Sequence, residues 1–293
     1  MGLGSAFARA RRAGARNGDD EPGGGGLAET AAQAEARYRR MIELRRMDAA
    51  DLRRLLAGDP ARAAAYVDTA ARFGVVEAQI RYGRMLLEGQ GVARDEGAAL
   101  QWLHRAARCG SAEAMNMVGR CFENGWGTPQ DLAEAARWYR ASGEAGCDWG
   151  EYNYANMLFD GRGVAEDRSG AVAWYRRAAG RGHTRAMNLL ARCQEEGWGG
   201  ARNAAEAFAW YRRSAEGGYF RAQFNYATLL AALGREEEAL AWFEAACRAA
   251  TPDSLRSMLD LLRGRPEPSL AGLGRRLEAE LAAPGAGTTE MEP

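Results

Sequence analysis

Small and apolar side chains recur along most of this chain at the spacing of an α-helix. In the segment 75–110, Tyr82 and Leu86 are four positions apart, and Ala99 and Trp102 are three positions apart. Side chains three and four positions apart share one face of an α-helix. The pattern therefore predicts two amphipathic helices in this segment, which we term the A helix and the B helix, packed through their apolar faces.

The same pattern returns every 36 residues. Four consecutive blocks fit this period without a gap: 75–110, 111–146, 147–182 and 183–218. Each block ends in glycine and carries a tryptophan at its twenty-eighth position: Trp102, Trp138, Trp174 and Trp210. A period of this length is typical of solenoids, in which each two-helix unit buries its apolar surface against its neighbours.

A Gly-x-Gly loop separates the two helices of each block, with glycine pairs at Gly89 and Gly91, Gly125 and Gly127, Gly161 and Gly163, and Gly197 and Gly199. Glycine adopts the positive φ at which an A helix can end. The residue four positions later is placed to N-cap the B helix: Asp95, Asp131, Asp167 or Asn203. We interpret these loops as turns and not as phosphate-binding loops, because no strand precedes them.

The composition supports an all-α protein. All 39 basic residues are arginine, and isoleucine occurs only at Ile42 and Ile80. Alanine, leucine, arginine and glutamate favour helices, whereas the β-branched residues of strands are scarce. The 39 acidic residues balance the charge, so net charge gives no reason to expect nucleic acid or an anionic membrane as partner. No apolar run is long enough to span a bilayer.

The segment from Ala112, AEAMNMVGRCFENGWGTPQDLAEAARWYRASGEAG, and its three counterparts resemble the Sel-one-like repeat (SLR), a relative of the tetratricopeptide repeat (TPR). The resemblance implies a right-handed α/α superhelical solenoid of helix-turn-helix repeats with helical caps. The predicted parts are a disordered Arg/Gly-rich tail at 1–27, an N-terminal helical cap and degenerate repeat at 28–74, four repeats at 75–218, a fifth, TPR-like repeat at 219–250, capping helices at 251–283 and a disordered tail at 284–293.

On each A helix, block positions four, eight, eleven and twelve form the apolar face, so positions three, six, ten and thirteen are expected to be exposed. In TPR relatives this side lines a concave groove that holds peptides, and the resemblance implies the same here. Trp149, Tyr152 and Phe159 place three aromatics on one block, which makes them the first candidate for a binding hot spot. The predicted groove residues are Arg84, Asn116, Arg120, Trp149, Tyr152, Asn156, Phe159, Arg185, Asn188, Arg192 and Phe224.

These residue types suit a peptide with an apolar side chain and acidic groups, because arginine binds carboxylates and asparagine pairs with peptide backbone. A solvated charged face without a ligand stays open as an alternative. Tyr152 and Phe224 can alternatively be interpreted as packing residues between units. For Trp126 and Trp198, packing over their own loops is an alternative to ligand contact.

The second and fourth blocks share residues that the first and third lack, including Trp126 and Trp198 between two glycines, and Arg120 and Arg192 before a cysteine. This indicates a 72-residue superrepeat. Two origins of this longer period stay open: sequence drift after a pair of units was duplicated, or a difference in function between odd and even repeats.

The favoured function is a non-enzymatic scaffold that binds a protein or peptide partner, because proteins that resemble this one commonly act as adaptors in complex assembly, signalling or secretion. Some secreted bacterial members of the family bind or hydrolyse β-lactams, but they carry paired cysteines, and this chain also lacks SxxK, GxSxG and HExxH motifs. Direct nucleic-acid binding is disfavoured by the interspersed acidic residues.

Five cysteines without a CxxC pair suit free thiols in a reducing compartment: Cys109, Cys121, Cys147, Cys193 and Cys247. No apolar h-region follows the first basic residues, so we expect a cytoplasmic protein. His104 and His183 lie in different blocks, and neither a metal site nor a cofactor is predicted. The use of arginine in place of lysine suggests a bacterial source with a GC-rich genome.

Overall fold

The computed structural model describes residues 30–263, 270–272, 274–275 and 278. The predicted tails at 1–27 and 284–293 lie outside these residues. Every element in the described part is a helix, which confirms the all-α class: α2 (Ala31–Arg46), α3 (Ala49–Ala57), α4 (Pro60–Arg72), α5 (Val76–Glu88), α6 (Glu96–Arg108), α7 (Ala112–Asn124), α8 (Leu132–Glu144), α9 (Asp148–Asp160), α10 (Arg168–Gly180), α11 (Thr184–Glu196), α12 (Ala204–Glu216), α13 (Phe220–Ala232), α14 (Glu236–Ala249) and α15 (Pro252–Arg263).

The helices fall into two compact units, which are described separately. Unit 1 comprises Met1–Tyr154 and Arg162–Ala165, and unit 2 comprises Ala155–Gly161 and Glu166–Pro293. Helix α9 contributes its first turns to unit 1 and its last turns to unit 2.

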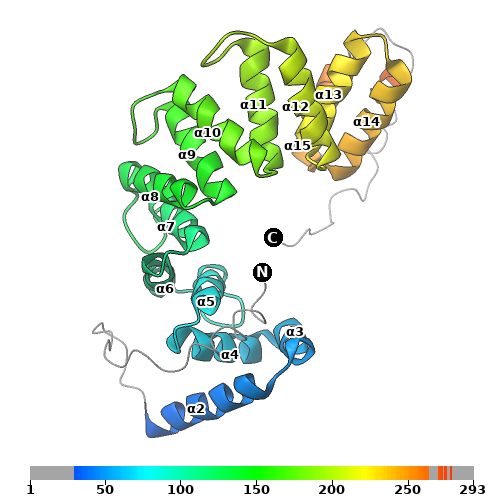
Figure 1. Ribbon diagram of the computed structural model, residues 1–293. Coiled ribbons are helices and arrows are strands. Elements are labelled where there is room, and N and C mark those ends of the chain that lie inside the picture. The colour runs from blue at the N-terminus through cyan, green and yellow to red at the C-terminus, as the bar shows by residue number, and fades with distance from the viewer. Residues whose placement is uncertain (1–29, 264–269, 273, 276–277, 279–293) are drawn as a thin grey trace. The chain divides into compact units, whose positions relative to one another are not determined.

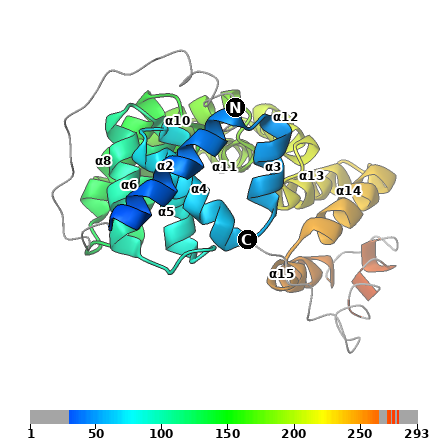
Figure 2. The ribbon, with the colours of Figure 1, turned by 90° about the horizontal axis from the view of Figure 1, so that it is seen from below.

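In unit 1, α5 with α6 and α7 with α8 form consecutive A and B helix pairs (Figure 1). Each B helix also packs on the A helix that follows it, as α4 does on α5 and α6 on α7. Helices α2 and α3 both contact α4 at the N-terminal end (Figure 2). The helices of the predicted cap and degenerate repeat therefore continue the stacking of the regular repeats.

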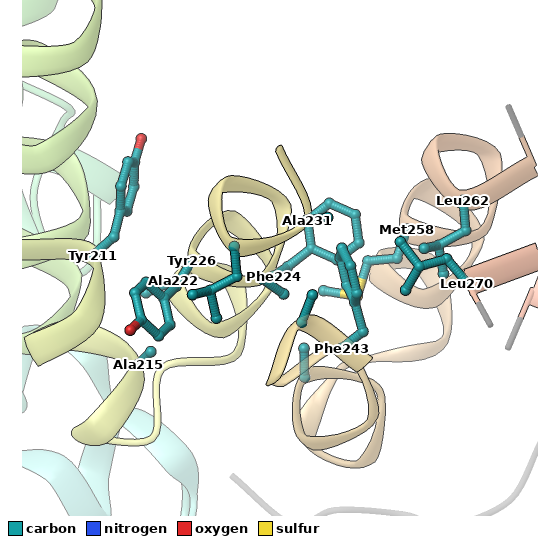
Figure 3. Packing of buried hydrophobic residues seen from close by; sticks show 14 of the residues in the cluster. Tyr211, Ala215, Ala222, Phe224, Tyr226, Ala231, Phe243, Met258, Leu262 and Leu270 are labelled. Atoms are coloured by element: carbon teal, nitrogen blue, oxygen red, sulfur yellow. The ribbon is translucent and has the colours of Figure 1, made fainter. Parts of the chain in front are cut away.

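In unit 2, α11 with α12 and α13 with α14 form the corresponding pairs, and α12 packs on α13. Figure 3 shows the buried side chains at the C-terminal end, where Phe224 of α13 points toward Phe243 of α14. Their ring centroids are 5.0 Å apart. Met258 and Leu262 of α15 and Leu270 beyond it extend the same buried cluster, so α15 covers the end of the last repeat.

Small residues bring the two helices of a repeat together, as the sequence predicts. A Cβ added to Gly119 on α7 would lie 2.7 Å from the ring of Tyr139 on α8. A Cβ on Gly83 of α5 would lie 2.9 Å from the side chain of Leu103 on α6. Glycine at this position therefore makes room for a large side chain from the B helix.

The second glycine of each loop also touches the preceding repeat. Gly127 has φ +70°, and an added Cβ would lie 2.2 Å from the carbonyl oxygen of Glu96 at the start of α6. Its N–H donates to Glu96 Oε2 at 3.2 Å. The loop then ends at Asp131, whose carboxylate accepts from the backbone N–H of Glu134 and caps α8. The loops thus connect neighbouring repeats as well as the two helices of one repeat.

Candidate partner-binding surface

In unit 1, four residues at positions three and ten of the A helices are exposed as predicted: Arg84, Glu113, Arg120 and Trp149. Glu77, at position three of α5, is half-buried. Arg84 forms an ion pair with Glu113 at 2.5 Å. The guanidinium of Arg120 lies 5.3 Å from the ring centroid of Trp126. Trp149 is 43% exposed, and its ring meets that of Tyr152 edge-on at 6.0 Å. This part of unit 1 presents a large aromatic surface to solvent.

Position six is buried on α7, α11 and α13 and half-buried at Tyr152 of α9, which corrects the prediction that this position is exposed. Asn116 is 7% exposed, Asn188 is 6% exposed and Phe224 is 7% exposed. Asn116 Oδ1 accepts from Asn153 Nδ2 at 2.8 Å, which ties α7 to α9 within unit 1. In the same way Asn188 Oδ1 accepts from an asparagine of α13 in unit 2. The two asparagines therefore link successive A helices, which cover a face that a single two-helix repeat leaves open. Phe224 instead packs on Phe243 of α14 in its own repeat.

In unit 2, Asn156 and Phe159 are half-buried and have partners. Asn156 Oδ1 accepts from the Tyr175 hydroxyl at 2.6 Å. The Phe159 ring lies 6.5 Å from that of Tyr175 and 5.4 Å from that of Trp198. The Trp198 ring therefore packs against the A helix of the preceding repeat.

Two arginines flank these rings in unit 2. The guanidinium of Arg192 lies 5.0 Å from the Trp198 centroid, and that of Arg168 lies 5.3 Å from the Phe159 centroid. Both arginines are exposed. Arg168 also pairs with Glu166 at 2.8 Å, whereas Arg192 has no carboxylate within ion-pair distance among the described residues. We term Phe159, Trp198, Arg168 and Arg192 the aromatic–arginine patch. Arg185, another predicted groove residue, is exposed on α11.

The 72-residue superrepeat has a structural counterpart that the sequence analysis missed. In both even repeats a glutamate at position thirteen of the A helix accepts from a buried tyrosine of the B helix. The paired contacts are Tyr139 to Glu123 at 2.6 Å and Tyr211 to Glu195 at 2.7 Å. The signal was visible as a glutamate and a tyrosine that recur 72 residues apart.

Two cysteines, a tyrosine and a histidine in the described cores have pKa values shifted towards their neutral forms. Burial raises the pKa of the Cys121 thiol to about 12 and that of Cys193 to about 11. Burial and the hydrogen bond to Glu123 raise the pKa of Tyr139. Burial and the charge of Arg108 lower the pKa of His104, whose ring packs edge-on against two aromatics of the next repeat. These groups behave as core residues and not as activated nucleophiles.

Across the described residues, no helix combines the length and apolar character that a membrane crossing requires. The same part of the chain holds no group of three or more His, Cys, Asp or Glu side chains that can bind a metal ion.

Stacked pairs of helices joined by Gly-x-Gly loops define an α/α solenoid repeat protein. The family model of the Sel1 repeat matches residues 76–111, 112–147, 150–183, 184–219 and 221–250. These matches make up more than half of the chain, which therefore belongs to the Sel1 repeat family. Solenoids of this family are generally protein-interaction scaffolds and are typically non-catalytic. A comparison with proteins of curated function finds no match.

Two solved bacterial structures share the fold. A Sel1 repeat protein from Oxalobacter formigenes is 25% identical with a TM-score of 0.67, and the match covers 78% of this chain and 97% of that protein. A protective antigen with an SLR fold, present in uropathogenic Escherichia coli strains, is 24% identical with a TM-score of 0.66. That match covers 86% of this chain but only 56% of the antigen. Both similarities support the solenoid architecture.

Proposed function

We propose that the exposed side of the A helices binds a protein or peptide partner and that the protein acts as a non-enzymatic adaptor. The observation that carries this proposal is Trp149. It lies at position three of its repeat and is 43% exposed, whereas the same position holds Glu113 and Arg185 in the neighbouring repeats. An exposed tryptophan supplies a large contact area at low entropic cost, as binding hot spots do.

The aromatic–arginine patch of unit 2 supports the same function and suggests the partner's chemistry. A guanidinium stacked on an indole keeps its N–H groups available to a carboxylate. Arg192 has this arrangement on Trp198 and no carboxylate partner among the residues described. The partner is therefore expected to carry an apolar side chain together with acidic groups.

The test is crosslinked affinity capture from the source cells with three forms of the full chain: wild type, Trp149→Ala, and Phe73→Ala as matched control. Phe73 is also an exposed aromatic of unit 1, at 48%, but it caps the end of α4. We expect a partner that wild type and Phe73→Ala enrich and Trp149→Ala loses. Equal capture by all three forms, at equal helicity, would show that the exposed tryptophan is not a contact.

We further propose a cytoplasmic location. The five cysteines are free thiols, of which Cys121 and Cys193 are buried in the repeat cores. Unpaired thiols suit a reducing compartment. Fractionation of the source cells, with detection of the full chain in each fraction, tests this location.

A further inference from the structure

Position thirteen of one A helix lies against position sixteen of the next repeat, at the tip of its Gly-x-Gly loop. In unit 1, Glu123 Oε1 pairs with Arg162 Nη2 at 3.0 Å. In unit 2, the ring of Phe159 lies 5.4 Å from that of Trp198. We term this series of contacts the loop ladder. One of its pairs is ionic and the other aromatic. The same two repeat positions therefore meet in both units, although the residue types differ.

The ionic pair of unit 1 uses both oxygens of one carboxylate. Glu123 Oε2 accepts from the buried Tyr139 hydroxyl at 2.6 Å, and Oε1 receives the guanidinium of Arg162. With both partners in place, the Glu123 side chain is only 23% exposed.

Glu195 repeats the first half of this arrangement in unit 2. Its Oε2 accepts from the buried Tyr211 hydroxyl at 2.7 Å. The second half is absent, because the fifth repeat has no Gly-x-Gly loop: α13 ends at Ala232 and α14 begins at Glu236. Position sixteen of that repeat is Gly234, which has no side chain to offer.

The carboxylate of Glu195 consequently has an open side. Glu195 is exposed, and no arginine or histidine among the described residues comes within ion-pair distance of it. Arg235, which ends the short turn of the fifth repeat, is engaged with Glu238 at 2.7 Å. Leu233, which stands at position fifteen where the regular repeats have glycine, is 63% exposed. The shortened loop thus leaves the Glu195 carboxylate without the guanidinium that Glu123 receives in unit 1.

We infer that Glu195 accepts an arginine side chain from a partner protein, presented on a tight turn as Arg162 is presented to Glu123. The Glu123–Arg162 pair is the internal template for this contact, since the same glutamate–tyrosine pair takes a guanidinium there. A planar guanidinium reaches the remaining oxygen beside the tyrosine hydroxyl and keeps further donors for the partner's own turn. This inference rests on the proposed function, because Glu195 lies on the same side of the A helices, and adds the chemistry of one contact.

A peptide that copies the template tests the contact directly. The probe is a cyclic peptide containing the loop sequence Asp160–Val164, titrated into isotope-labelled full chain while the carboxyl carbon of Glu195 is followed by NMR. We expect a saturable shift at millimolar peptide. Replacing the peptide's arginine by citrulline, which is neutral and nearly isosteric, is expected to weaken binding about fivefold or more.

Two protein variants control for non-specific effects. Binding to the variants is followed through the backbone amide signals of α11, because Glu195→Gln has no carboxyl carbon to observe. Glu195→Gln is expected to lose peptide binding, whereas Glu123→Gln keeps it, because Arg162 already occupies the Glu123 carboxylate. A chimera that carries the third-repeat loop Gly161–Glu166 in place of Leu233–Arg235 is expected to lose peptide binding, because its own arginine faces Glu195. Changing that arginine to glutamine in the chimera is expected to restore binding.

No shift of Glu195 at about 10 mM peptide, roughly tenfold above a dissociation constant of about 1 mM for a weak surface contact, would overturn the inference. Equal binding of the citrulline peptide would overturn it too. Self-association of the wild type that Glu195→Gln abolishes would assign the contact to a second copy and not to a foreign partner. A negative result here combined with loss of partner by Trp149→Ala would leave the proposed function intact and remove only this contact.

Discussion

The two glycines of the loop between α7 and α8 offer a test of how the repeats are joined. Gly125 and Gly127 have nearly equal dihedral angles, with φ +75° and +70°. Their surroundings differ. An added Cβ at Gly125 would find its nearest atom 3.5 Å away within its own loop, whereas at Gly127 it would lie 2.2 Å from the carbonyl oxygen of Glu96 in the preceding repeat.

The two alanine substitutions therefore separate conformational strain from steric overlap. Gly125→Ala forces an alanine into the left-handed conformation, which lowers the free energy of unfolding by about 1–2 kcal/mol. Gly127→Ala adds an overlap with backbone that cannot rotate away, which is about 1–3 kcal/mol more on the scale of overpacked cores. The expected total for Gly127→Ala is about 2–5 kcal/mol.

Guanidinium chloride unfolding followed by far-ultraviolet circular dichroism measures both variants against wild type. Amide hydrogen exchange near Glu96 adds a local readout, because displacing the loop also breaks the hydrogen bond from Gly127 N–H to Glu96 Oε2. Faster exchange is expected in Gly127→Ala and not in Gly125→Ala. Equal loss of stability in the two variants, with unchanged exchange near Glu96, would refute the claim that the second glycine holds neighbouring repeats together.

Three further measurements probe the cores. Asn116→Ala removes a buried inter-repeat hydrogen bond and leaves its partner unsatisfied, so the free energy of unfolding in denaturant is expected to fall by about 1–3 kcal/mol. The control Asn124→Ala changes an exposed side chain and is expected to alter this free energy by about zero. A thiol reagent at pH 8 is expected to label exposed Cys109 on the order of 1000-fold faster than Cys121, whose buried thiol has its pKa raised to about 12; similar rates would contradict the burial. His104 has a lowered pKa in the folded protein, so the unfolded chain takes up the proton at a higher pH. The free energy of unfolding is therefore expected to fall as the pH drops through about 6.5. His104→Leu is expected to reduce this fall, measured by urea unfolding at pH 7 and pH 5.

The repeat pattern was sufficient to predict most of the fold. Each A helix of the four regular repeats ends at the first glycine of its loop, which takes a positive φ, as at Gly89 and Gly125. The side-chain caps at Asp95 and Asp131 also lie where the sequence places them. These features depend on residues within one repeat, which is why a single block of sequence predicts them.

Features that depend on three helices were not predicted. Asn116 lies on the side of α7 that points away from its own B helix, and only the arrival of α9 buries it. Phe159 looked like an exposed hot spot because the loop of the next repeat, with Trp198, is far from it in sequence. Helical periodicity describes the surface of one helix, and it contains no information on which neighbour covers which part of that surface.

The two candidate contacts depart from the repeat in different ways. Residues that maintain a solenoid must recur with its period, since each repeat presents the same surface to its neighbours. Trp149 fails to recur: the residues one period away are Glu113 and Arg185, so stacking does not require an aromatic there. Glu195 recurs with Glu123, but its guanidinium partner is missing because the fifth repeat lacks the loop. The repeat period therefore does not explain why Trp149 is a tryptophan or why the Glu195 carboxylate lacks the arginine that Glu123 has, and the proposed partner contacts would supply a reason for both.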